Sequence, residues 1–317
     1  MRQRLFESRH AKLWQEAEEF VQGLGIGDAR RLPRLHRAIC HSLSVARQRG
    51  YSPSLCDRLH GLSAATHRAL YGTRPEQPAV FRQWVAQGFP RLVRAEWRVV
   101  LLAMVAFWGT ALALGILVWF HPDQAAAWID PSQIDSMKQM YSPDKIRLGR
   151  GGSDGDLAMF GFYIWNNVSI CFRTFAGGIL GGIPALLSLA MNGVNLGVAG
   201  SVLSQDPATR ITFWSFVVTH SSFEITGLVL AGASGLKLGH SLLSPGRLTR
   251  VRSLAHTGRQ ILPLLVGAAV LTFVAAFFEG FWSAQPSIAP SAKFLVGGLC
   301  WTLVATYLLF GGRSRGR

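Results

Sequence analysis

Charged residues are scarce in this chain of 317 residues, where Asp, Glu, Lys and Arg make up 15% of positions against 49% hydrophobic residues. A soluble domain normally carries about 25% charged residues, so the composition argues against one. The chain also lacks an opening apolar stretch of the secretory type, because residues 1–20 mix basic with acidic side chains. We therefore expect the first residues to stay in the compartment where they are made.

Cysteines and acidic residues are few as well. The four cysteines show no metal-ligand spacing, and we expect no disulfide, no metal and no other cofactor. They are Cys40, Cys56, Cys171 and Cys300. Acidic residues number 17 against 32 basic ones, which gives a formal net charge of +15. In a membrane protein such an excess is typical of cytoplasmic segments that face anionic lipid, so we expect membrane lipids as partners and no nucleic acid.

Long apolar runs are abundant. Val99–Phe120 holds 22 residues without a charge, and about 20 helical residues cross the hydrocarbon core of a membrane. Five more runs follow, and two of them are joined by a tight glycine-rich connection near 177–184. The predicted spans are residues 99–120, 157–179, 183–204, 211–236, 260–281 and 294–312. The sequence therefore predicts an all-α fold, with a polytopic transmembrane helical bundle over residues 98–312.

Basic flanks predict the orientation of the bundle. The segment after the fourth predicted span has no acid between Glu224 and Glu279, which is typical of a cytoplasmic loop. Its basic residues are Lys237, Arg247, Arg250, Arg252 and Arg259. With six spans, both chain ends lie on this side, including the basic tail 313–317. We expect a multi-pass protein of a bacterial cytoplasmic (inner) membrane with both termini cytoplasmic.

Residues 1–97 are predicted to form a basic cytoplasmic helical domain. Turn residues at 23–28 and 50–53 separate helices expected over Leu5–Val21, Pro33–Arg49 and Ser54–Tyr71. Apolar residues recur at helical spacing in the second and third of these helices. They are Leu35, Ile39 and Leu43, then Leu55, Leu59 and Leu62.

Two further segments flank the first span. Val80–Trp97 interleaves arginines with aromatic residues, which suits a helix in the membrane interface, although a solvated connector is the alternative. Residues 121–156 contain six aspartates against four Lys and Arg, and we expect a polar loop on the outer side. Its glycine-rich end, 149–156, lacks the ligand spacing of a calcium loop and the lysine of a P-loop, so we predict a flexible tip.

Polar residues recur about ten residues deep in the second, third and fourth spans. They are Asn166, Asn167, Asn192, Asn195 and His220, with Glu224 about thirteen residues into its span and Arg173 farther along the second span. His220 and Glu224 are four apart and share one helix face, and Arg173 lies at a depth that could reach Glu224. Such residues face the bundle interior and are functional hypotheses by default, while interhelical hydrogen bonding, a structural His–Glu pair and a snorkelling arginine stay open. Glu279 is expected to be an interfacial acid.

Glycines four residues apart indicate close helix packing in the same spans. The expected packing positions are Gly177, Gly178, Gly181, Gly182, Gly193, Gly197, Gly235 and Gly239. Close approach there would enclose the polar residues in one core and would also permit a homo-oligomer.

These residues resemble the stage II sporulation protein M family. The resemblance covers about residues 90–312. It rests on Asn166-Asn167, the segment Phe175–Gly181, Asn192-Gly193, His220–Glu224, Ala231–Ala233 and Phe277–Phe281, with Ser221 where the family commonly has glycine. The resemblance implies a membrane scaffold, without a catalytic centre, that holds a peptidoglycan-remodelling complex. The long arginine-rich domain and the sixth span depart from the sporulation protein and fit a branch from bacteria that do not sporulate.

Three functions remain open. We expect a non-enzymatic scaffold that gathers protein partners through its cytoplasmic domain. The alternative is a transporter, channel or lipid-moving protein that uses the polar residues as a route. An intramembrane hydrolase is the third hypothesis, but His220 and Glu224 lack the second histidine of a zinc protease motif, and no nucleophile elbow is present.

Overall fold

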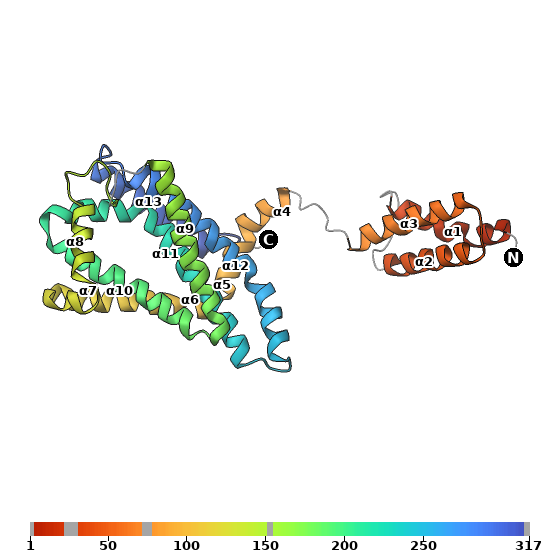
Figure 1. Ribbon diagram of the computed structural model, residues 1–317, viewed down its shortest axis with the longest axis horizontal. Helices are drawn as coiled ribbons and strands as arrows, with labels where there is room; N and C mark the ends of the chain where they lie inside the picture. Colours follow the sequence, from red (N-terminus) through yellow and green to blue (C-terminus); the bar gives the residue numbers. More distant parts are fainter. Residues whose placement is uncertain (1–2, 22–30, 72–77, 151–154, 314–317) are drawn as a thin grey trace. The chain divides into compact units, whose positions relative to one another are not determined.

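The computed structural model describes all residues except 1–2, 22–30, 72–77, 151–154 and 314–317. The described residues are mostly helical and contain no strand, which confirms the predicted all-α class. The chain divides into two compact units, Met1–Phe81 and Arg82–Arg317 (Figure 1). The sequence analysis ends the first domain at residue 97, whereas the structure groups residues 82–97 with the second unit. The predicted break at 23–28 lies outside the described residues.

The N-terminal unit is built from three helices: α1 (Gln3–Val21), α2 (Leu32–Gln48) and α3 (Pro53–Tyr71). Every apolar residue of the two predicted stripes is buried. Ile39 and Leu59 are fully buried and pack with Trp14 of α1 in one apolar cluster. Burial of each such side chain stabilises the fold by roughly 1.5–3 kcal/mol, so this unit has a core of its own.

Five stretches of helix in the described chain are long and apolar enough to cross a membrane: Trp97–Phe120, Ile183–Gln205 (α10), Pro207–Leu243 (α11), Arg250–Ser283 and Pro290–Phe310 (α13). The first comprises α6 (Trp97–Met104), η3 (Val105–Gly109) and α7 (Thr110–Phe120). The fourth comprises α12 (Arg250–Phe278) and the π-helical turn η6 (Glu279–Ser283). They correspond to the first and to the third through sixth predicted spans.

The second predicted span forms α9 (Asp156–Ala176). Its 21 residues extend about 32 Å at 1.5 Å per residue, which is the thickness of a hydrocarbon core. Asn166, Asn167 and Arg173 make it less apolar than the other five. The protein is therefore a multi-pass helical bundle in which the count of six spans is approximate.

Glycines of α10 bring it against the first span. A Cβ atom at Gly193 would overlap the carbonyl oxygen of Phe107, and one at Gly197 would overlap that of Ala111. Thr110 Oγ1 donates across the same contact to Ala190 O at 3.1 Å. Only glycine lets these two backbones approach so closely.

The predicted connection near 177–184 is present between α9 and α10. It consists of a 3-10 turn, η5 (Gly177–Leu180), followed by Gly181 and Gly182 at φ +75° and +87°. Because side chains disfavour positive φ, these two glycines make the turn and do not lie on a helix. Gly178 contacts Gly235 of α11, and Gly182 contacts Gly239. The turn is thereby packed onto α11.

Short helices fill the remaining connections: α4 (Pro78–Gln83), η2 (Trp84–Gly88), α5 (Phe89–Ala95), η4 (Pro122–Ala127) and α8 (Pro131–Met140). Phe89 is buried against Gly267 of α12. Arg94 donates to Leu308 O at 2.6 Å and to Gly311 O at 2.7 Å, where the free carbonyls of a helix end favour a cation. The segment expected in the membrane interface thus packs on the bundle through α5.

Candidate functional site

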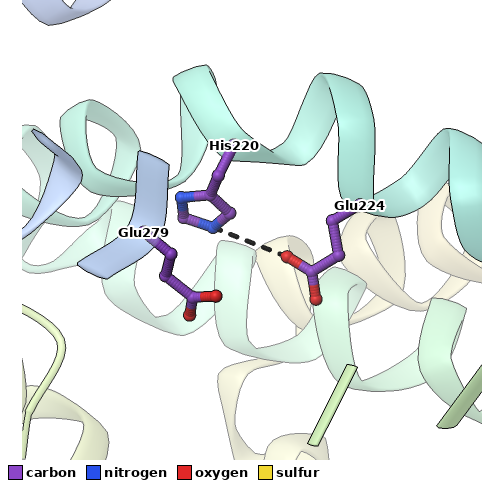
Figure 2. A group of neighbouring side chains, drawn as sticks. All are labelled: His220, Glu224 and Glu279. Atoms are coloured by element: carbon purple, nitrogen blue, oxygen red, sulfur yellow. Dashed lines mark ion pairs between the residues drawn. The ribbon is translucent and has the colours of Figure 1, made fainter. Parts of the chain in front are cut away.

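The centre of the candidate site is formed by two residues of α11, His220 and Glu224. This helix starts after Asp206, whose side chain caps it by accepting a hydrogen bond from Ala208 N at 2.9 Å. One helical turn joins His220 to Glu224, and His220 Nε2 lies 3.7 Å from Glu224 Oε2 (Figure 2). The His220 side chain is 5% exposed, whereas that of Glu224 is 32% exposed. The carboxylate end of the pair is therefore not sealed in the core.

Glu279 joins this pair from a different span. It is the first residue of η6, a π-helical turn that continues α12, and such turns are frequent at functional sites. One ligand atom each from His220, Glu224 and Glu279 lies within 4.8 Å of the other two. Figure 2 shows the Glu279 and Glu224 side chains on either side of the imidazole. The residue that the sequence analysis treats as an interfacial acid thus belongs to the cluster.

Asn167 of α9 connects a third helix to the cluster. Its Nδ2 donates to Glu279 Oε2 at 3.3 Å, and its Oδ1 accepts from Asn166 Nδ2 at 3.0 Å. Asn167 is 4% exposed, so its amide must be satisfied within the protein. This chain of two amides holds the Glu279 carboxylate in place.

Ser283 and Lys293 support His220 from the opposite side. His220 Nδ1 lies 3.1 Å from Ser283 Oγ, and Lys293 Nζ donates to Ser283 O at 2.8 Å. Both supporting side chains are buried. The sequence analysis does not single out either residue, although a lysine at the edge of the last apolar run is a signal that could have pointed to it.

Tyr141, the residue after α8, lies near the cluster and packs toward it through Phe216. Its ring packs edge-on against Phe216 at 5.6 Å, and the Phe216 ring packs edge-on against His220 at 5.0 Å. Burial, followed by the negative charge of Glu279, raises the pKa of Tyr141 well above its usual value. The phenol therefore stays neutral at physiological pH.

The other predicted cluster residues lie apart from this centre. Arg173 is exposed and donates from Nε to Ser169 O at 3.2 Å. Among the described residues the ion-pair partner of Glu224 is His220, not Arg173. Asn192 and Asn195 donate to carbonyls four residues earlier in α10, at 2.8 and 3.0 Å. These three side chains thus bond to their own helices.

Arg150 is a site neighbour that sequence reasoning missed. Its guanidinium is buried and donates to Gly280 O of η6 at 2.7 Å and to Asp156 Oδ1 at 2.8 Å. The backbone before it is bonded too, because Leu148 N donates to Ala284 O at 3.1 Å. This part of the predicted flexible tip is therefore hydrogen-bonded to the turn that carries Glu279. Residues 151–154 of the tip lie outside the described chain.

Comparison with known families places this geometry in context. The model of the family described as "Stage II sporulation protein M" matches residues 99–284, which is more than half of the chain. The chain belongs to the stage II sporulation protein M family. Its N-terminal unit matches a second model, a domain of unknown function (DUF8413), over residues 4–72. No curated protein and no solved structure is similar enough to match.

The stage II sporulation protein M match contains His220, Glu224, Glu279 and Asn167, and ends one residue after Ser283. Lys293 lies beyond it. Within the matched region the site offers one imidazole nitrogen and two carboxylates from two helices. Such a donor set can share a proton or hold a cation.

Proposed function

We propose that this protein is a non-enzymatic scaffold of a bacterial inner membrane, with cytoplasmic termini and a role linked to cell-envelope or peptidoglycan remodelling. The observation that carries the proposal is the two-part construction of the chain. The N-terminal unit has its own apolar core and its own family match, distinct from those of the membrane unit. A self-contained helical unit joined to a membrane bundle supplies a docking surface, and the sporulation family name supports the link to the envelope.

Charge on α2 indicates the chemistry of the partner. This helix contains arginine and histidine but no acidic residue. Its apolar face is buried, while Arg34, Arg37 and Arg47 are exposed. A row of exposed guanidinium groups favours an acidic protein surface. We therefore propose protein partners that carry carboxylates where they meet α2.

The geometry around His220 supports a non-enzymatic role. The imidazole lies between the Ser283 hydroxyl and the Glu224 carboxylate, which is the order of residues in a Ser-His-acid triad. However, Ser283 is fully buried, and 3.7 Å between His220 and Glu224 exceeds a hydrogen bond. A hydroxyl enclosed in this way cannot reach the carbonyl of a substrate.

Site-specific photo-crosslinking in native membranes tests the scaffold proposal. The probe replaces Arg37 on α2 in the full-length protein, and a matched probe replaces exposed Lys138 on α8. We expect a discrete crosslinked neighbour from position 37 that is absent from position 138 and is lost when Arg34 and Arg47 are changed to Glu. Identical background products from both positions would count against a docking role.

A polar route through the bundle is the second candidate function, and the exposure of Glu224 favours it. A carboxylate in a membrane helix that is 32% exposed is placed to meet a passing ion or polar group. Ion flux into proteoliposomes tests this candidate. Flux above that of empty vesicles, and its loss in Glu224→Gln, would support a route, whereas flux equal to the empty vesicles would remove it.

A further inference from the structure

The spacing of His220, Glu224 and Glu279 matches the geometry of a small coordination site. A tetrahedral metal ion binds nitrogen and oxygen ligands at about 2.0–2.2 Å, which puts neighbouring ligand atoms about 3.3–3.6 Å apart. His220 Nε2 and Glu224 Oε2 are 3.7 Å apart, and all three ligand atoms lie within 4.8 Å of one another. The three atoms are thus close to, and slightly wider than, the spacing of ligands around one ion.

The hydrogen bond at the other ring nitrogen of His220 also fits metal binding. A ligating histidine normally presents one ring nitrogen to the metal while the other donates to an oxygen nearby. Here Nδ1 faces Ser283 Oγ at 3.1 Å, and Nε2 faces the Glu224 carboxylate across 3.7 Å. When Nδ1 donates to Ser283, the Nε2 lone pair and the carboxylate oxygen face each other. A cation between them turns that repulsion into attraction.

The charges of the cluster call for a positive partner. Two carboxylates approach each other within the bundle, and among the described residues no lysine or arginine forms an ion pair with either of them. Lys293 donates to the backbone of Ser283. The positive charge of Arg150 acts on Glu279 from nearby, but its guanidinium donates to Gly280 O and Asp156. Two like charges this close together in a partly buried site are disfavoured unless one of them is neutralised. One divalent cation offsets both carboxylates.

We propose that His220 Nε2 and one carboxylate oxygen each of Glu224 and Glu279 bind a divalent transition-metal ion. Mixed imidazole and carboxylate donors suit Zn²⁺, Fe²⁺ or Mn²⁺ better than Ca²⁺ or Mg²⁺, which prefer oxygen alone. Asn167 orients Glu279 and Ser283 orients His220 as outer partners. The ion ties the middle of α11 to the end of α12. This site is independent of the scaffold proposal.

Metal analysis of the full-length protein tests the site. The protein is purified in detergent with a tag that contains no histidine, stripped with a chelator, loaded with Zn²⁺ or Mn²⁺, and separated from free metal by gel filtration. We expect one ion per chain in the wild type and loss of that ion in His220→Ala and in the Glu224→Gln/Glu279→Gln double variant. Asn167→Ala should bind about tenfold more weakly.

Matched variants separate the site from adventitious binding and from misfolding. His256→Ala removes an exposed histidine of α12 and should keep the full ion. The melting temperature of the wild type should rise on metal addition, while that of the double variant should not. No bound metal in the wild type, or equal metal in wild type and double variant, overturns the proposal. If the His220–Glu224–Glu279 cluster shares a proton in place of a metal ion, the wild type should bind no metal.

Discussion

Asn167 Nδ2 donates a hydrogen bond to Glu279 Oε2 at 3.3 Å and so links α9 to the end of α12. Hydrogen bonds between membrane helices contribute about 0.6–2 kcal/mol. We expect Asn167→Ala to lower the free energy of unfolding by this amount, and Asn167→Asp to lower it further because a second negative charge then faces Glu279. Thermal unfolding of the full chain in detergent measures both.

Asn195→Ala is the control for this prediction. Asn195 is exposed and, within the part of the chain that the structure describes, its side chain bonds only to Met191 O of its own helix. Its loss should therefore leave the melting temperature nearly unchanged. Equal effects of the two alanine variants would show that the hydrogen bond between Asn167 and Glu279 adds nothing measurable to the stability of the protein.

Close glycine packing between α10 and the first span gives a second prediction. A Cβ atom at Gly197 would overlap Ala111 O, and forcing extra atoms into a packed contact typically costs about 1–3 kcal/mol. Gly197→Ala should therefore lower the melting temperature. Gly298→Ala should not, because nothing lies within 4 Å of the added Cβ atom there. Calorimetry on both variants distinguishes a glycine that is needed for close helix packing from one that is not.

The sequence predicts the parts of this protein that depend on local spacing. The apolar stripe through Ile39 and the shared face of His220 and Glu224 both follow from the helical period. The place of Glu279 does not, because it depends on how α12 packs against α11. Arg150 is hidden for a similar reason, since a glycine-rich stretch gives no sign that its arginine reaches the carbonyl of Gly280.

Arg173 shows why depth along a helix is an incomplete guide. Counting residues places Arg173 near the level of Glu224, but it does not fix the direction of the side chain about the helix axis. Six residues separate Asn167 from Arg173, and at about 100° per residue the two point about 120° apart. With Asn167 directed at Glu279, Arg173 is turned to the exposed side of α9.

The N-terminal unit should lose stability when its core is truncated. Ile39 is fully buried among α1, α2 and α3, and replacing a buried isoleucine with alanine costs about 2–5 kcal/mol. Ile39→Ala should speed amide hydrogen exchange throughout α1 to α3 in the full chain. Arg37→Ala, at an exposed position of the same helix, should leave exchange unchanged. Uniform protection in both variants would contradict a core centred on Ile39.

Arg150 and Arg147 provide a matched pair for testing the hydrogen bonds that attach the loop before α9 to η6. Both donate to Asp156 Oδ1, at 2.8 and 3.2 Å, but only Arg150 is buried and also reaches Gly280 O of η6. Because a hydrogen bond to a charged group contributes about 1.5–3 kcal/mol, Arg150→Ala should lower the free energy of unfolding by at least that much. Arg147, with 35% of its side chain exposed, should contribute less than about 1 kcal/mol.

Hydrogen exchange at η6 measures the local consequence. Loss of Arg150 should expose the amides of Glu279–Ser283 to faster exchange, because the guanidinium no longer holds Gly280 O against the loop. Arg147→Ala should leave these amides protected. If both variants exchange at the wild-type rate, the Arg150 guanidinium does not secure the turn that carries Glu279, and the backbone bond from Leu148 N to Ala284 O and the Asn167 amide remain to hold it.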